Sequence, residues 1–188
     1  MQAEIEPLIR SAQEGNLSAF GSIYESLFPK VYRYVAARVG YGPEAEDIAQ
    51  EVFLKAINSL DKFQFRGPPF ISWLFRIAHN LVVDRVRHMK STFGPMVPLD
   101  EALALPDAQN VENQALQALD VEVLRRALGR VSELQRQVVL LRFIAGLSLA
   151  ETAMAMNRKE NTIKALQHSA LAALRRVMHP IISESALR

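Results

Sequence analysis

The sequence predicts an all-α protein made of two small helical domains joined by a flexible linker. Apolar residues recur at three- and four-residue steps in nearly every segment before residue 90, and again after residue 110. The stretch between them lacks this period and contains three prolines, which disfavour helix. The predicted organisation is a first domain at residues 1–90, a linker at 91–110 and a second domain at 111–188.

Composition and charge narrow the possible classes of protein. Hydrophobic residues make up 49% of the 188 residues, and the chain has no cysteine, which excludes disulfides and thiolate zinc sites. No run of about 18 apolar residues occurs, so no membrane insertion is expected. The N-terminal segment MQAEIEPLIR carries acids where a signal peptide carries bases, which predicts a cytoplasmic protein. Because the net charge is only +2, nucleic-acid binding would depend on local clusters of cations.

The first domain begins with a short helix that is expected to stop near Gly15. A second helix is predicted from about Ser18 to Val39, and Pro29 inside it should kink or locally break it, because proline removes a backbone donor. A third helix is predicted from Pro43 to about Leu60. Its first turn is rich in acids, which the helix dipole favours at an N-terminus.

The next helix, predicted from Phe70 to Arg87, organises the domain. One face of it is apolar, and another combines a flat aromatic ring, guanidinium groups and an amide; this second face holds Trp73, Arg76, Asn80, Asp84 and Arg87. Such groups stack on unpaired bases and hold phosphates. The loop before it, Asp61–Pro69, adds aromatic and basic residues. At this point a core position for Trp73 with solvated arginines remains an open alternative.

The second domain shows the pattern of a helix-turn-helix motif. Its predicted helices are Val111–Arg130, Glu133–Ala145, Leu149–Met156 and Glu160–Met178. Ser148 and Glu151 form a capping-box sequence, and Asn157 suits the tight turn. The last helix of such a motif presents its N-terminal side chains to base edges in the major groove. Those positions are Arg158, Lys159, Glu160, Asn161, Thr162 and Lys164, with His168 one turn further along.

Enzymatic chemistry finds no support in the sequence. A carboxylate-bridged metal bundle needs Glu-x-x-His pairs, and none of the four histidines follows a glutamate at that spacing. No HExxH, glycine-rich phosphate loop or GxSxG sequence occurs. The sequence therefore predicts a protein that is not an enzyme and has no metal or cofactor. The acids from Glu44 to Glu51 are interpreted as a protein-docking patch.

Three segments carry a family resemblance: EDIAQEVFLKA at Glu46–Ala56, FRGPPFISWLFRIAHNLVVDRVR at Phe65–Arg87, and LSLAETAMAMNRKENTIKALQHSALAALRR at Leu147–Arg176. Together they resemble the extracytoplasmic-function (group four) sigma factors of the sigma-70 family, the promoter-recognition subunits of bacterial RNA polymerase. The resemblance implies sigma region 2 in the first domain and region 4 in the second. It implies transcription initiation as the function, and core RNA polymerase, promoter DNA and an anti-sigma factor as partners.

The resemblance also implies roles for individual residues. Docking on core polymerase falls to Asp47, Gln50, Glu51 and Phe53. Recognition of the minus-ten element, including capture of a flipped base, falls to Phe65, Arg66, Trp73, Arg76, His79, Asn80, Asp84, Arg85 and Arg87. The minus-thirty-five element falls to the residues from Arg158 to His168 named above. Leu166, Ser169 and Leu171 stand where family members often have arginine, so weak duplex binding is expected, with Ser169 exposed on the DNA side.

A different class of function remains open at this stage. The chain could be a stand-alone helix-turn-helix regulator whose N-terminal domain dimerises or senses a ligand. The acidic patch and the Trp/Arg/Asn face favour the sigma factor, since a ligand-sensing domain has no need for single-strand chemistry.

Overall fold

The computed structural model describes residues 2–93 and 127–185, and within these ranges every regular element is a helix. The first domain consists of α1 (Gln2–Gln13), α2 (Leu17–Val39), α3 (Pro43–Asn58), the 3₁₀ turn η1 (Leu60–Lys62) and α4 (Phe70–Phe93). The second contains α6 (Glu133–Val139), the π-helical segment η2 (Leu140–Ile144), α7 (Leu149–Ala155) and α8 (Glu160–Ser185). The predicted all-α fold is confirmed.

The helix α2 begins where Asn16 accepts hydrogen bonds from the backbone N–H groups of Ser18 and Ala19. The predicted local break at Pro29 does not occur: α2 continues as one helix through this residue. Proline leaves the carbonyl of Glu25 without its helical donor. Both residues lie on the exposed side of α2, where water can satisfy that carbonyl.

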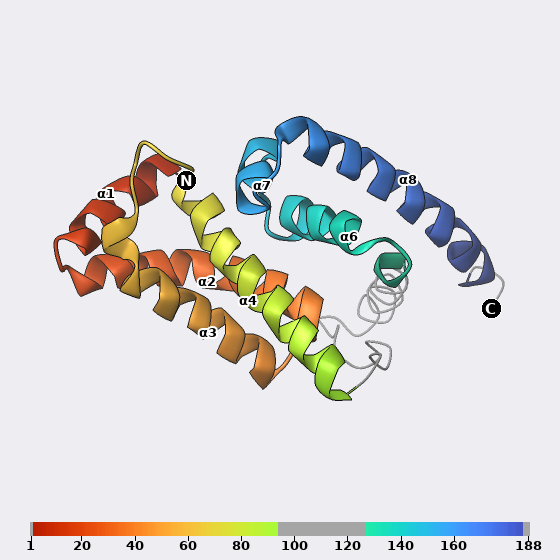
Figure 1. Ribbon diagram of the computed structural model, residues 1–188, viewed down its shortest axis with the longest axis horizontal. Helices are drawn as coiled ribbons and strands as arrows, with labels where there is room; N and C mark the ends of the chain where they lie inside the picture. Colours follow the sequence, from red (N-terminus) through yellow and green to blue (C-terminus); the bar gives the residue numbers. More distant parts are fainter. Residues whose placement is uncertain (1, 94–126, 186–188) are drawn as a thin grey trace.

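The core of the first domain forms where α2, α3 and α4 meet. The most deeply buried large side chains there include Tyr34, Phe75, Ile23, Leu27 and Leu74. They recur at helical spacing along α2 and α4, so one stripe of each helix faces the same interior. In Figure 1, α4 runs diagonally between this bundle and the second domain. The helix that organises the first domain therefore also faces the second.

The second domain confirms the predicted helix signals. Ser132 and Ser148 each begin a helix with a reciprocal capping box, completed by Gln135 and Glu151 respectively. The turn before α8 contains Asn157 at a φ of 52°, the left-handed conformation that asparagine tolerates. The helices α4 and α8 run further than predicted, to Phe93 and Ser185. The linker beyond residue 93 and the predicted helix up to residue 126 lie outside the described residues.

The two domains contact each other directly. The short helix α7 packs across α4, and η2 packs against α2. Figure 1 shows α7 beside the upper part of α4, with α8 lying above. Within residues 2–93 and 127–185, no helix combines the length and the apolar character that crossing a membrane requires.

Candidate nucleic-acid and polymerase interfaces

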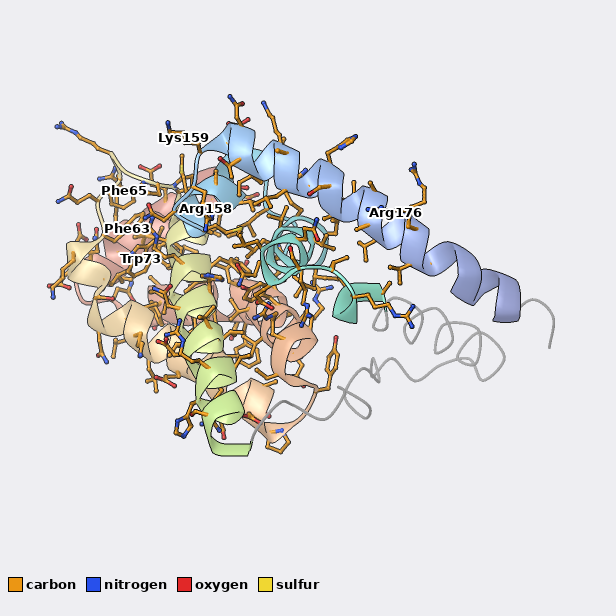
Figure 2. All side chains as sticks on the ribbon, turned by 45° about the vertical axis from the view of Figure 1, so that its right-hand side comes forward. Phe63, Phe65, Trp73, Arg158, Lys159 and Arg176 are labelled. Carbon is orange, nitrogen blue, oxygen red and sulfur yellow. The ribbon has the colours of Figure 1, made fainter. Side chains whose placement is uncertain are left out.

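Four aromatic rings gather where the loop enters α4. Phe63 lies at the centre, with ring centroids 5.4 Å from Phe65, 5.3 Å from Phe70 and 5.4 Å from Trp73. Phe63 and Phe70 are buried, whereas Phe65 and Trp73 are half-buried. Figure 2 shows Phe63, Phe65 and Trp73 together at the N-terminal end of α4. Trp73 thus packs on the core and also retains exposed surface, so the alternative of a fully buried core position is wrong, and its role at DNA stays a prediction.

Several predicted minus-ten residues lie on the exposed side of this region. Asn80 and Arg66 are exposed. Arg85 is also exposed, and its Nε donates to Glu44 Oε1 at 2.6 Å, which links α4 to the start of α3. The exposed Arg87 lies 3.6 Å from Asp84 on the same helix. Surface pairs of this kind contribute little stability, so both arginines can exchange their carboxylate for a phosphate.

Arg76 and His79 do not share that exposed surface. Arg76 Nη2 donates to the backbone oxygen of Met154 at 3.1 Å and to Asn157 Oδ1 at 3.3 Å, both in the helix-turn-helix of the second domain. His79 Nδ1 lies 3.3 Å from the hydroxyl of the buried Tyr34. The sequence predicted both residues at DNA. In this structure Arg76 instead contacts the second domain, where α7 packs on α4, and His79 packs inside the first domain against Tyr34 of α2.

An ion pair also joins the two domains, between α2 and α6. Arg38 of α2 forms an ion pair with Glu133 at the start of α6, and the Arg38 side chain is only 2% exposed. Burial alone would raise the pKa of Glu133, but the Arg38 charge and hydrogen bonds outweigh it, so this pKa lies below its ordinary value. Burial, followed by the Arg38 charge, lowers the pKa of His79. Sequence analysis missed Arg38, although a cation within the apolar stripe of α2 was a usable signal.

Three of the four residues that the sequence predicted for docking are exposed on α3. Asp47, Gln50 and Glu51 are exposed on α3. The prediction that Phe53 lies with them is wrong: this side chain is 3% exposed and packs against the rings of Phe20, Tyr24 and Phe28. Phe53 follows Glu51 by only two residues, which rotates it to the opposite side of the helix. Leu54, which the sequence analysis did not single out, is 61% exposed beside the acids.

The second domain presents its predicted DNA-reading residues to solvent. All of the predicted positions are exposed, namely Arg158, Lys159, Glu160, Asn161, Thr162, Lys164 and His168. Figure 2 shows Arg158 and Lys159 at the beginning of α8. Lys164 lies 3.1 Å from Glu160 one turn earlier. The anchor of the helix is Ile163, which is completely buried.

The expectation for Ser169 is wrong. Its hydroxyl accepts a hydrogen bond from Gln135 Nε2 at 3.1 Å and donates to the backbone oxygen of Leu166 at 3.0 Å. Ser169 therefore ties α8 to α6 and does not face DNA. Leu166 is half-buried, whereas Leu171 is exposed. At two of the three positions, Leu166 and Ser169, the side chain thus packs against the domain, which explains why arginine is absent there.

Comparison with protein families matches both halves of the chain. The model for sigma-70 region 2 matches residues 23–92, and the model for sigma-70 region 4 matches residues 127–176. BldN of Streptomyces coelicolor, an ECF RNA polymerase sigma factor, is 37% identical over 180 residues, which cover 94% of this chain and 66% of BldN. SigD of Mycobacterium tuberculosis, another such factor, is 34% identical over 181 residues, covering 93% of this chain and 84% of SigD.

The chain belongs to the ECF RNA polymerase sigma factors. This family consists of transcription initiation factors. The chain spans 66% of the length of BldN. A solved structure of the sigma factor RpoE from Bartonella quintana, in complex with the anti-sigma factor NepR, has the same fold: its TM-score is 0.68 at 23% identity, over 85% of this chain and 96% of that one.

The described part of the sigma factor lacks a cluster of metal-binding side chains. No group of three or more histidine, aspartate or glutamate side chains suited to a metal ion occurs in it. Its exposed functional groups are donors, planar rings and carboxylates. These groups suit binding to DNA and protein surfaces.

Proposed function

We propose that this sigma factor directs core RNA polymerase to specific promoters and assists strand melting at the minus-ten element. The observation that carries the proposal is that Phe65, in the loop before α4, and Trp73, in its first turn, both pack on Phe63 and keep exposed surface. Asn80 is exposed about two turns further along α4. Unstacking one base costs a few kcal/mol. Stacking on an aromatic ring returns about 1–3 kcal/mol per base, so these groups can stabilise an unpaired strand.

Each remaining surface has a role in this proposal. Asp47, Gln50 and Glu51 dock on core polymerase, and Leu54 adds apolar contact to that face. The N-terminal part of α8, from Arg158 to His168, contacts the minus-thirty-five element as duplex. The protein itself is not an enzyme, acts in the cytoplasm without a metal or cofactor, and is held inactive by an anti-sigma factor.

Arg76 enters minus-ten recognition only after the domains separate. Arg76 is held by Met154 and Asn157 of the second domain, so its guanidinium is not available to a phosphate in this conformation. Promoter binding therefore competes with the contact between α4 and α7. A stand-alone regulator is the less favoured alternative, since it gives no purpose to a region 2 domain.

Reconstitution with core polymerase tests the proposal. Reversing the charges of Asp47 and Glu51 to lysine should weaken core binding, with unchanged circular dichroism because both side chains are exposed. Asn80→Ala should leave core binding and thermal stability unchanged but reduce permanganate reactivity of promoter thymines. Wild-type protein that fails to bind core polymerase would refute the proposal and support the stand-alone regulator.

A further inference from the structure

The first helix of the chain holds the loop that precedes α4. Gln13, at the end of α1, points its amide nitrogen at two backbone oxygens: Leu60 at 2.8 Å and Phe63 at 2.9 Å. These oxygens lie at the start of η1 and immediately after it. One side chain therefore fixes both ends of the turn that delivers Phe63 and Phe65.

A second residue of α1 acts on the ring at the edge of this loop. The guanidinium carbon of Arg10 lies 4.0 Å from the centre of the Phe65 ring, a cation–π contact. Glu6 Oε1 accepts from Arg10 Nη2 at 2.8 Å, which orients the guanidinium. The Phe65 ring also makes an edge-to-face contact with the Phe63 ring. Phe65 is thus held between α1 and the aromatic cluster.

The loop has few other restraints. The described backbone hydrogen bonds of the loop are short-range: Lys62 N–H donates to Ser59, Phe63 N–H to Leu60, Gly67 N–H to Gln64, and the N–H of Trp73 to Pro69 at the start of α4. A cavity separates the loop from α1, and its walls include Ile5, Ile9, Phe63, Phe65 and Pro68. Because a cavity gives no support through packing on this side of the loop, Gln13 and Arg10 supply its polar restraints from α1, while Phe63 holds the other side in the aromatic cluster.

We infer that α1 is a positioning element for minus-ten recognition, in which Gln13 sets the loop backbone and Arg10 sets the Phe65 ring. The inference rests on the proposed function. It extends that function to a helix that precedes the matched region 2, which begins at residue 23. Neither residue needs to touch DNA, since each acts through Phe65. Ordering these groups before binding spares the entropy cost of ordering them on the promoter.

The test uses Gln13→Glu, which keeps the shape of the side chain but replaces the amide donor with a carboxylate that two carbonyl oxygens repel. Glu14→Gln, at an exposed position of the turn that follows, is the matched control. The probe is a duplex selected from random DNA by the wild-type holoenzyme and then prepared with an unpaired minus-ten segment. The single tryptophan, Trp73, reports the loop directly, because its ring lies 5.4 Å from Phe63.

Gln13→Glu should shift the emission of Trp73 and weaken binding to the probe about tenfold, the effect of losing hydrogen bonds worth roughly 1.4 kcal/mol. Arg10→Leu should weaken it about threefold. Core binding should stay unchanged in both variants. Wild-type emission and affinity in Gln13→Glu would overturn the inference, as would an equal loss in Glu14→Gln. A wild-type holoenzyme that selects no DNA would instead overturn the proposed function.

Discussion

Breaking the Arg38–Glu133 ion pair should open the contact between the two domains. Removing one partner of a buried pair costs roughly 3–5 kcal/mol, because the other charge stays buried alone. Glu133 is 48% exposed, so water already screens it, whereas Arg38 is 2% exposed. We therefore expect Glu133→Ala to cost about 2 kcal/mol, a shift of roughly 30-fold in the equilibrium between contacting and separated domains.

The asymmetry in exposure gives a sharper expectation. Arg38→Met removes the buried charge and leaves Glu133 where water can solvate it. This variant should therefore lose less free energy of unfolding than Glu133→Ala. The double variant should recover most of the loss, since replacing both charges by apolar groups is close to neutral. Small-angle X-ray scattering gives the radius of gyration of each variant, and urea titration gives the free energy of unfolding.

Glu133→Ala should increase the radius of gyration and increase the affinity of the holoenzyme for a promoter with an unpaired minus-ten segment, because Arg76 is released. If the radius and the urea midpoint both equal those of the wild type, the ion pair does not hold the domains together. A double variant as unstable as Glu133→Ala would show that the loss comes from α6 itself, whose first turn contains Glu133.

Three further outcomes follow from the described contacts. Phe53→Ala should cost about 3–5 kcal/mol of unfolding free energy, with a lower thermal midpoint; a stable variant with weakened core binding would restore Phe53 to the docking face. Lys164→Ala should make the log–log salt slope of duplex binding shallower by about 0.9, measured by fluorescence anisotropy, while Ser169→Arg should lower the melting temperature without steepening that slope. Acidification below the ordinary histidine pKa of about 6.5 should lower the free energy of unfolding: burial lowers the pKa of His79, so the unfolded chain binds the proton more readily, and the contribution of His79 is complete above this pH and is lost as the pH falls. Urea titration between pH 7.5 and 5.5 checks this, and His79→Gln should weaken the dependence in that range.

The sequence by itself determined the helices and most of their ends. Ser132, Ser148 and Asn157 act through hydrogen bonds and backbone conformations within a few residues, so their positions could be read from the chain. The exposed positions from Arg158 to His168 also followed from the helix-turn-helix pattern, which presents the N-terminal part of its last helix outward. The helix α2 was the exception among local signals, because solvent exposure at Pro29 removed the expected break.

Only the tertiary structure decided which faces of the helices are available. Helical spacing groups Phe53 with Val52 and Ala56, but only the packed structure shows that this stripe of α3 is buried and that the adjacent Leu54 is exposed. Likewise, the polar residues Arg76 and Ser169 resemble surface positions in the sequence, but partners on α7 and α6 satisfy them. Those partners lie 78 and 34 residues away in the chain. A side chain's availability depends on such distant packing, which local sequence patterns do not contain.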